Sequence, residues 1–317
     1  MQLPVEAPVL LITFNRPKYL KEVLSALKKA KVSNLFVFRD GPRPMNEADR
    51  TAGNQIEELV KNIDWPCNVI TNYMNNNLGC GWGPFTAISW AFQFTDRLII
   101  LEDDCVPTPA FFKFCNTLLE KYQNNLKVRH ISGYSQFTDD EIFKRYDYIF
   151  TQYAPTLGWA TWKRVWDNCD MHERLIAPFF KNGGFNGQFS TKKEDKYFNH
   201  YYWQRLSPLY EATHSWDYQY AVHSKMNGAL SIIPAKNLIN YIGMEGTHGS
   251  DKSYYELSAS DDFVVSKHPN NIELIPEYEM TYFTRYCKTP LLRDIKFKLI
   301  RVKNRILGRP DFPAAKR

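Results

Sequence analysis

Three consecutive carboxylates, Glu102, Asp103 and Asp104, directly follow an apolar run at residues 98–101 (LIIL). Like charges at the end of a buried strand repel one another and lose hydration, so they require a cation, bound hydroxyl groups or water among them. Carboxylate oxygens are the ligands that hard divalent ions such as Mg²⁺ and Mn²⁺ prefer. The triplet therefore predicts a divalent metal site, and the alternative is an acidic loop that is solvated or paired with nearby Lys or Arg.

Polar residues also follow two other apolar runs in the first half of the chain. Asn15 and Arg16 come after the run at 8–14, and Asp40 comes after the run at 34–39. In open α/β sheets, ligands bind beyond the carboxyl ends of the strands. We therefore expect these side chains to share one crevice with the carboxylate triplet.

The elements that must position these residues can be read from the hydrophobic pattern. The first half alternates β-rich apolar runs with segments of helical periodicity, which is typical of an α/β fold with a mostly parallel sheet flanked by helices. The predicted strands are residues 8–14, 34–39, 67–71, 97–101 and 127–132. The predicted helices are residues 17–30, 46–62, 84–94 and 109–123.

The second half is richer in aromatic residues and less regular, and nothing in it reads as a linker. We therefore predict one domain over residues 1–280, with a ligand-binding sheet half at 1–135 and a second half at 136–280. A basic tail at 281–317 follows it.

The acidic triplet belongs to a series of short motifs that keep their order from about residue 8 to residue 250. These motifs are TFNRP (13–17), RDGPR (39–43), NLGCG (77–81), ILEDDCVP (100–107), HISGY (130–134), GWATW (158–162), WDYQ (216–219) and SIIP (231–234). The series resembles GT-A fold glycosyltransferases, especially inverting enzymes of the N-acetylglucosaminyltransferase I type. It also resembles a group of bacterial nucleotide-diphospho-sugar transferases, some of them described as hemolysin-like.

The resemblance implies a Rossmann-like GT-A sheet of mixed, mostly parallel strands. It implies a metal-dependent, inverting glycosyltransferase, acting on a nucleotide-sugar donor such as a UDP-sugar. The implied acceptor is a hydroxyl of a glycan, a lipid-linked saccharide or a protein. In this fold the first half binds the nucleotide sugar and the second half faces the acceptor.

The resemblance also implies a role for each acid of the triplet. Asp104 would bind the Mn²⁺ or Mg²⁺ that bridges the two phosphates of the donor, while Glu102 and Asp103 would contact hydroxyls of the ribose or the donor sugar. One carboxylate and two phosphates neutralise much of a divalent ion's charge. The other two acids are then free to accept hydrogen bonds from hydroxyls.

Three residues at the ends of the first two predicted strands are implied to face the nucleotide. Asp40 would accept the imide N–H of uracil, and the alternative is a residue of an Asp-Gly-Pro turn. Asn15 and Arg16 would contact the ribose or the diphosphate. The alternative for Arg16 is a surface residue ahead of a helix that begins with proline.

The glycine-rich stretch at 75–84 (NNNLGCGWGP) is expected to form a loop before a helix. Gly79 and Gly81 would let backbone N–H groups approach the diphosphate. The stretch departs from the related enzymes, because no basic residue precedes its Asn-Leu-Gly and Trp82 stands where a lysine is common. These departures bear on the phosphate contacts of the loop and on the choice of donor.

An inverting transferase needs a carboxylate that takes the proton of the attacking acceptor hydroxyl. Asp217, in the segment SWDYQYAVH (215–223), resembles the aspartate of a Trp-Asp-Asp-Trp segment in the N-acetylglucosaminyltransferase I type, and we predict it as this base. Asp195 and Glu245 are rival bases. The structural alternative for Asp217 is an acid that stabilises the N-terminus of its helix.

Three further residues complete the predicted site. His248, in GMEGTHGS (243–250), is implied by the resemblance as a second metal ligand or a contact to the leaving phosphate, although a lone histidine is more often structural. Trp159 and Trp162 are predicted to stack on a sugar, and their alternative is packing in the core.

The formal charge of +6 is concentrated at the C-terminus, where residues 281–317 carry +9 and the rest of the chain −3. Residues 291–309 place apolar side chains on one helical stripe flanked by basic ones. This pattern suits a helix on an anionic membrane surface, and equally a helix that packs on the body of the protein. A nucleic-acid partner is not expected, because no basic and aromatic platform recurs elsewhere.

The bulk composition indicates a globular protein of the cytoplasm, peripheral to the inner face of the membrane if the tail binds lipid. With 317 residues, 44% of them hydrophobic, the chain can form a large core. It lacks a run of about 20 apolar residues, and its N-terminus lacks the features of a signal peptide. The six cysteines show no CxxC pair, so we expect reduced thiols rather than zinc ligands or disulfides.

Two other functions remain alternatives. A sugar-nucleotide nucleotidyltransferase would attack the α-phosphate, but it normally carries a glycine-rich basic loop after the first strand, and residues 13–20 (TFNRPKYL) contain no glycine. A non-catalytic carbohydrate-binding or membrane-tethered protein of the same fold would bind without turnover. The joint presence of Asp104, Asp217 and His248 argues against it.

Overall fold

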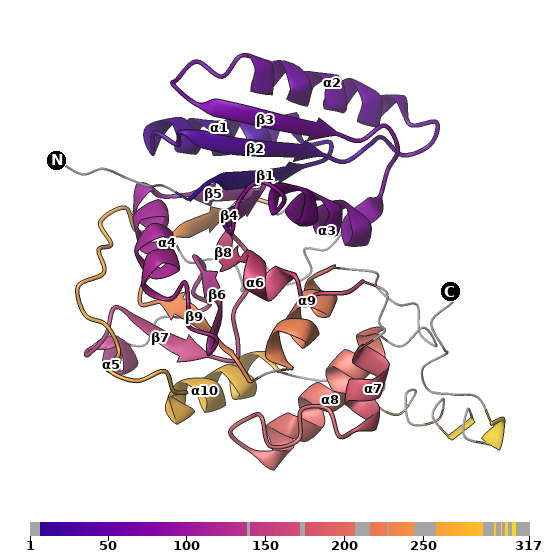
Figure 1. Ribbon diagram of the computed structural model, residues 1–317, viewed down its shortest axis with the longest axis vertical. Helices are drawn as coiled ribbons and strands as arrows, with labels where there is room; N and C mark the ends of the chain where they lie inside the picture. The colour runs from indigo at the N-terminus through magenta and orange to yellow at the C-terminus, as the bar shows by residue number, and fades with distance from the viewer. Residues whose placement is uncertain are drawn as a thin grey trace.

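A single mixed sheet of eight strands runs through the protein. The structure is a computed structural model that describes residues 7–137, 140–171, 175–206, 216–226, 228–243 and 258–287, with 295, 299, 302–303 and 306–308 in the tail. The strands of the sheet are β1 (Val9–Thr13), β2 (Asn34–Arg39), β3 (Asn68–Tyr73), β4 (Arg97–Glu102), β6 (Val128–Ser132), β7 (Tyr148–Thr151), β8 (Trp159–Trp162) and β9 (Leu230–Pro234). Their order is β3-β2-β1-β4-β8-β6-β9-β7 (Figure 1).

The strand directions confirm the predicted mixed, mostly parallel sheet. Strands β3, β2, β1 and β4 are parallel, as are β6 and β9. Strand β8 runs antiparallel to both β4 and β6, and β7 runs antiparallel to β9. Because the chain crosses over through helices between β1, β2, β3 and β4, the carboxyl ends of these four strands meet at one edge.

Helices flank this sheet. They are α1 (Pro17–Lys29), α2 (Glu47–Lys61), α3 (Gly79–Ala91), α4 (Pro109–Lys121), α5 (Asp140–Phe143), α6 (Lys163–Trp166), α7 (Ile176–Lys181), α8 (Lys192–Leu206), α9 (Trp216–Lys225) and α10 (Pro276–Tyr286). Helix α1 shows how the sequence sets an element: Pro17 opens it, and its buried side chains Leu20, Val23, Leu24 and Leu27 follow the spacing of one helical face. None of the helices among the described residues is long and apolar enough to cross a membrane.

The second half of the chain extends the sheet and adds a group of helices below it. Helices α7, α8 and α10 gather at the end of the molecule away from α2, and α9 connects them to the sheet by packing against both α8 and α3 (Figure 1). A second apolar cluster lies among these helices and includes Tyr153, Ile176, Phe185 and Phe198. Strands from both sides of residue 135 therefore share one sheet. The boundaries predicted at residues 135 and 280 remain a prediction.

A short antiparallel pair lies next to the acidic triplet. Strand β5 (Cys105–Pro107) follows the triplet and pairs with β10 (Ile239–Tyr241), so that Cys105 faces Tyr241. This pair brings a distant part of the chain beside the carboxyl end of β4.

The structure differs from the predicted elements at α3 and at residues 159–162. The helix expected at 84–94 begins at Gly79 and ends at Ala91, so Gly79, Gly81 and Pro84 lie inside α3 rather than in a loop before it. Residues 159–162 form strand β8, where no strand was predicted. In both places long-range contacts override weak local propensity. Strand β8 is defined by its pairing with β4 and β6, and the start of α3 is bound by Asp40.

Candidate functional site

The acidic triplet lies at the carboxyl end of β4, beside the end of β1. The two strands are parallel neighbours, with Ile12 opposite Glu102. The residues that follow β1 therefore lie beside those that follow β4, and the backbone N–H of Phe14 donates a hydrogen bond to Asp103 (3.4 Å). The expected meeting of the two strand ends is present.

Arg16 provides a cation within the triplet. Its Nη2 forms an ion pair with Asp103, and its Nη1 lies 2.7 Å from Oδ2 of Asp104. Asp103 and Asp104 are buried, whereas a third of the Arg16 side chain is exposed. Arg16 thus reaches from the surface into the cluster and supplies one positive charge.

One positive charge does not offset the carboxylates that gather here. Burial raises the pKa of Glu102 to about 8, and the charges of Asp104, Asp103 and Asp217 add to that rise. Burial likewise raises the pKa of Asp103 to about 6, although Arg16 acts in the opposite direction. Raised pKa values in a cluster of acids mean that the site retains protons, and it would retain a metal ion for the same reason.

A metal ion fits the donor chemistry of the site. Asp104 offers carboxylate oxygens, the ligand type that Mg²⁺ and Mn²⁺ take. No group of three or more His, Cys, Asp or Glu side chains converges on one point within the ranges described above. An ion such as Mg²⁺ uses one or two protein carboxylates and completes its shell with water and substrate phosphates.

The chain that leads to His248 passes directly beside Asp104. The N–H of Ile242 donates to the carbonyl oxygen of Asp104 (2.9 Å). A Cβ atom added to Gly243 would lie 2.4 Å from Oδ2 of Asp104, so only glycine fits this close approach. His248 and Glu245 lie outside the described residues, and five residues of chain from Gly243 to His248 span at most about 18 Å.

Asp40 holds the start of α3. Its Oδ1 accepts hydrogen bonds from the N–H groups of Gly41 and Leu78 (both 2.8 Å), and its Oδ2 accepts from the N–H of Gly79 (3.0 Å) and from Asn77 Nδ2 (2.9 Å). Burial raises the pKa of Asp40, and these donors act against that rise. The carboxylate therefore occupies the helix N-terminus that was expected to receive a diphosphate, while its contact with uracil remains a prediction.

Asn15 is held by an aspartate that the sequence reasoning missed. Asn15 Nδ2 donates to Asp49 Oδ1 (2.8 Å), and Arg43 binds the same carboxylate through Nε (2.6 Å) and Nη2 (2.9 Å). The bonds from Arg43 hold the pKa of Asp49 at about 2. Asn46 with Asp49 three residues later is a recognisable helix start, but the sequence does not show that Asp49 also ties together the loops after β1 and β2.

Asp217 brings a carboxylate from the second half of the chain near Glu102. It is the second residue of α9, and its charge raises the pKa of Glu102. It also borders a cavity of about 260 Å³ among β6, the end of β7 and helices α8, α9 and α10. Asp217 therefore lies near Glu102 and at the edge of this cavity.

The rival base Asp195 has a structural role. Its Oδ2 accepts from the N–H of Gly187 (2.8 Å), and its Oδ1 accepts from the N–H of Phe189 (3.0 Å). Both oxygens are thus used to hold the loop before α8.

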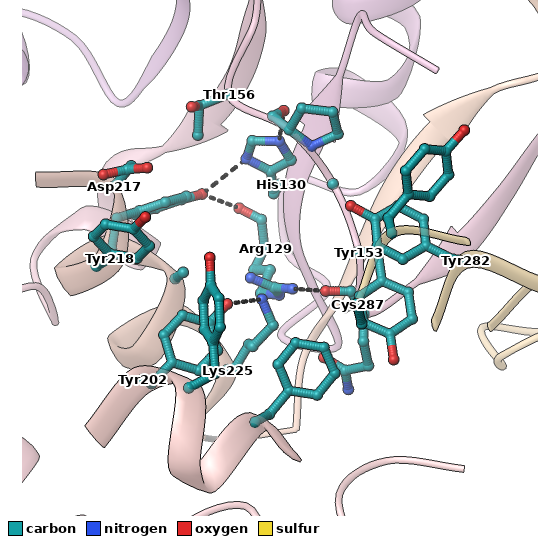
Figure 2. A pocket seen from close by; sticks show the side chains of 18 of the residues that line it. Arg129, His130, Tyr153, Thr156, Tyr202, Asp217, Tyr218, Lys225, Tyr282 and Cys287 are labelled. Carbon is teal, nitrogen blue, oxygen red and sulfur yellow. Dashed lines mark hydrogen bonds between the residues drawn. The ribbon is translucent and has the colours of Figure 1, made fainter. Parts of the chain in front are cut away.

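The cavity was not predicted, because its wall comes from five separated elements. Asp217 and Tyr218 lie on one side of it and Tyr153 and Tyr282 on the other, with Arg129 between them (Figure 2). His130 also lines it: Nε2 must donate to the carbonyl of Pro155 (3.1 Å), which leaves Nδ1 to accept from Tyr220 (3.2 Å). Burial lowers the pKa of His130 to about 3, so this imidazole is neutral.

Trp159 and Trp162 are packed inside the protein. Trp159 is 1% exposed and stacks between His130 and Trp216, with ring centroids at 5.0 and 5.5 Å. Trp162 is 3% exposed and donates its Nε1–H to the carbonyl of Leu119 (3.0 Å). In this conformation neither indole presents a face to a sugar, and both serve the packing of β8.

Comparisons with known proteins find likeness to this chain among solved structures. No protein-family model matches it, and no curated protein matches it. Among solved structures, it is similar to the inositol-1-phosphate CTP transferase from T. maritima, at 12% identity over 80% of this chain and 96% of that chain, with a TM-score of 0.41.

Two other solved structures show similar likeness. The UDP-glucose pyrophosphorylase complexed with UDP-glucose has 10% identity over 79% of this chain and 96% of that chain, with a TM-score of 0.38. The 4-diphosphocytidyl-2C-methyl-D-erythritol synthase from Anaerococcus prevotii has 11% identity over 62% of this chain and 98% of that chain, with a TM-score of 0.31. At these identities and TM-scores the likeness does not assign an activity to the chain.

Proposed function

We propose that the protein is a metal-dependent glycosyltransferase that moves a sugar, with inversion, from a nucleotide-diphosphate donor to a hydroxyl group. The observation that carries the proposal is the position of Asp217 near the acidic triplet and at the edge of a cavity. Its charge acts on Glu102 at one side, and it borders a cavity at the other. A carboxylate between a metal-binding acid cluster and a cavity suits a base that serves two substrates at once.

The chemistry follows from these positions. The acceptor sits in the cavity, and Asp217 takes the proton of its hydroxyl group while the oxygen forms a bond to the anomeric carbon of the donor. The bond from that carbon to the diphosphate breaks on the opposite face, so the configuration inverts. A divalent ion at Asp104, with His248 as a predicted second ligand, would supply positive charge for the departing diphosphate.

The donor side of the proposal rests on the ends of the first four strands. Glu102 and Asp103 would accept hydrogen bonds from donor hydroxyls, and Asn15 and Arg16 lie at the neighbouring strand end. Arg16 is already close to two carboxylates, so a bound metal ion and a diphosphate would share its charge. Asp40 and the start of α3, with Gly79 and Gly81, form the adjacent wall, where uracil is the proposed base.

Calorimetric titration of nucleotides tests this donor site. UDP, GDP and CMP are titrated into the wild type and into Asp104→Ala, first with Mn²⁺ and then with EDTA. We expect UDP to bind only with the metal, and Asp104→Ala to weaken binding at least about tenfold, because a charged ligand of the ion is lost. Asp64→Ala is the control, since Asp64 pairs with Lys28 at an exposed site elsewhere.

The outcome that overturns the proposal is equally direct. If none of the nucleotides binds under any condition, the triplet is a structural acidic cluster held by Arg16. The chain would then be a non-catalytic binding protein of this fold, the alternative noted from the sequence.

Nucleotidyl transfer is the second candidate, and the matched structures include a CTP transferase and a UDP-glucose pyrophosphorylase. A basic residue directly after β1, which is Arg16 here, is the feature that favours it. The two reactions differ in their products. A nucleotidyltransferase supplied with UTP and a sugar 1-phosphate releases pyrophosphate, whereas a glycosyltransferase supplied with a UDP-sugar releases UDP, and ³¹P NMR separates the two.

We also propose that the tail holds the protein at an anionic membrane surface. The apolar side chains described in the tail are exposed, and they are Ile295, Leu299, Val302, Ile306 and Leu307. The first four recur at the spacing of one helical stripe. Exposure of this stripe favours the membrane-surface alternative over packing on the body.

Removal of residues 288–317 should abolish binding to anionic vesicles and leave UDP binding intact. The deletion takes away ten basic residues, each worth about 1 kcal/mol near an anionic surface. Co-sedimentation with vesicles of phosphatidylglycerol measures the effect, with phosphatidylcholine vesicles and added salt as controls. Unchanged sedimentation of the truncated chain would refute membrane attachment through the tail.

A further inference from the structure

Two basic side chains line the cavity beside Asp217 although both are buried. Arg129, on β6, is 3% exposed, and Lys225, at the end of α9, is 6% exposed. Within the described part of the chain, no carboxylate forms an ion pair with either of them. A buried cation without a counter-charge is costly, so this arrangement calls for a reason.

Lys225 is the less satisfied of the two. Its Nζ makes one long hydrogen bond, 3.4 Å to the hydroxyl of Tyr202, and lies 5.7 Å from the centre of the same ring. Burial and the charge of Arg129 hold the pKa of Lys225 well below its usual range. An anion in the cavity would supply the counter-charge that the protein does not.

Arg129 is fixed in place by the protein. Its Nε donates to the carbonyl of Ala229 (2.8 Å), Nη1 donates to Ser224 (2.7 Å), and Nη2 donates to the carbonyl of Gln152 (3.3 Å). These partners are neutral, so the guanidinium keeps its full charge. A guanidinium has five N–H donors, and these three bonds leave two for a ligand.

Two buried carboxylates form hydrogen bonds with residues that line the cavity. Glu279 accepts from Thr151 Oγ1 (2.5 Å) and from the N–H of Gln152 (3.3 Å), and Glu194 accepts from the hydroxyl of Tyr153 (2.9 Å). Burial raises the pKa of Glu279 to about 8, so it is largely protonated at neutral pH and offsets little of the charge on Lys225. The charged groups on the cavity surface itself are Arg129, Lys225 and Asp217.

The rest of the wall is rich in tyrosine, which suits a sugar. Tyr153 and Tyr282 stack at 4.2 Å on one side, and Tyr202 and Tyr218 lie on the other (Figure 2). Tyrosine offers an apolar face together with a hydroxyl that both donates and accepts. At about 260 Å³ the cavity is smaller than the roughly 300–1,000 Å³ of sites for drug-sized ligands, so it has room for a single sugar residue.

We propose that this cavity binds the acceptor as an anionic sugar, one that carries a carboxylate or a phosphate, and that Lys225 and Arg129 recognise its negative group. The proposal rests on the glycosyltransferase function given above. Asp217 would repel the negative group and so direct it toward Lys225. Eight residues of helix separate the two, a rise of about 12 Å along α9, so the base and the anion-binding end lie at opposite ends of the cavity.

Binding of matched sugars to Lys225→Met tests the proposal. The probes are methyl glucuronide, glucose 6-phosphate and neutral methyl glucoside, each measured by saturation-transfer NMR with unlabelled protein. We expect the wild type to bind at least one of the anionic sugars about 10- to 100-fold more tightly than the neutral one, and Lys225→Met to lose that preference. Preference for the glucuronide or for the phosphate tells which negative group is read.

Two further measurements separate this proposal from its premise and from a structural role. UDP with Mn²⁺ should bind Lys225→Met as tightly as the wild type. If UDP does not bind the wild type, the proposed glycosyltransferase function fails, whereas the proposal that the cavity binds an anionic sugar is still tested by the sugar titrations. Removal of an unpaired buried charge should leave the melting temperature unchanged or raise it. Lys196→Met, at an exposed lysine of α8, is the control and should change neither measurement.

Three outcomes would overturn the proposal. The first is equal affinity of the wild type for neutral and anionic sugars. The second is a preference for anionic sugars that survives in Lys225→Met. The third is a Lys225→Met variant that melts well below the wild type and no longer binds UDP, since Lys225 would then serve the fold.

Discussion

Replacement of Asp217 with asparagine should lower the rate of sugar transfer by about 10²- to 10⁴-fold, the usual contribution of a general base. Asparagine has the same shape but cannot accept the proton of the acceptor hydroxyl. Because Asp217 belongs to the first turn of α9, loss of its charge should also cost about 0.3–1 kcal/mol of stability through the helix dipole. Affinity for UDP with Mn²⁺ should stay within about twofold, since no nucleotide contact is assigned to this residue.

The control for this prediction is Asp195→Asn. Asp195 uses both carboxylate oxygens to hold the N–H groups of Gly187 and Phe189, so its replacement should lower the free energy of unfolding by about 1–2 kcal/mol. The rate per folded molecule should not change. Single-turnover measurements at saturating UDP-sugar separate the two effects. The opposite pattern, with slow transfer in Asp195→Asn and normal transfer in Asp217→Asn, would show that the base lies on α8 rather than on α9. It would refute the mechanism.

The mechanism requires the acidic triplet on one side of Asp217 and the cavity on the other. The sequence predicts the site around the triplet but not the cavity. The meeting of Arg16 with the acidic triplet was expected, because the carboxyl ends of parallel strands share an edge and each strand was readable from its own apolar run. The strand at 34–39 was predicted with its observed bounds. Local patterns suffice for these elements, since their apolar residues are consecutive and turn or helix signals bound them.

Residues whose roles depend on distant partners could not be read in this way. Two of the backbone N–H groups that bind Asp40, those of Leu78 and Gly79, lie 38 and 39 residues further along the chain. The strand at 159–162 exists because β4 and β6 lie on either side of it. Trp159 and Trp162 were predicted to stack on a sugar because the local sequence does not show whether a tryptophan is exposed or buried. The cavity beside Asp217 escaped for the same reason, since no stretch of sequence contains its wall.

Glycine and proline misled the prediction of α3 for an identifiable reason. The segment that opens this helix contains Gly79, Gly81, Gly83 and Pro84, all unfavourable in helix interiors. Asp40 compensates by accepting hydrogen bonds at the N-terminus of the helix, where a negative charge is favourable. A carboxylate supplied from another strand therefore permits a helix that local propensity disfavours.

The second large effect is expected from Arg16→Ala, which removes the cation of the acidic cluster. Breaking a buried ion pair on one side usually costs about 3–5 kcal/mol, and a third of the Arg16 side chain is exposed, so we expect a loss of about 1–3 kcal/mol at pH 8. Chemical denaturation measures this free energy. Because the two buried aspartates would then repel each other without compensation, the cluster should bind Mn²⁺ more tightly than in the wild type.

The loss should depend on pH, with a sign that follows from the raised pKa values. An acid whose pKa is higher in the folded state stabilises the fold when it is protonated, and that stability is lost as pH rises through the folded pKa. Asp103 has a folded pKa of about 6 with Arg16 present, and removal of Arg16 should raise it further. The cost of Arg16→Ala should therefore be small at pH 5, where the folded state holds the proton, and largest at pH 8.

Addition of Mn²⁺ distinguishes a metal site from a purely structural ion pair. At pH 8 the ion should restore most of the stability that Arg16→Ala loses, because it replaces the missing positive charge at Asp104. The control is Arg43→Ala, which removes the arginine from Asp49, a single carboxylate that keeps its bond from Asn15. Mn²⁺ should not rescue this control. If it rescues neither variant, or if the cost of Arg16→Ala is the same at pH 5 and pH 8, the triplet needs only the guanidinium and the case for a metal at Asp104 fails.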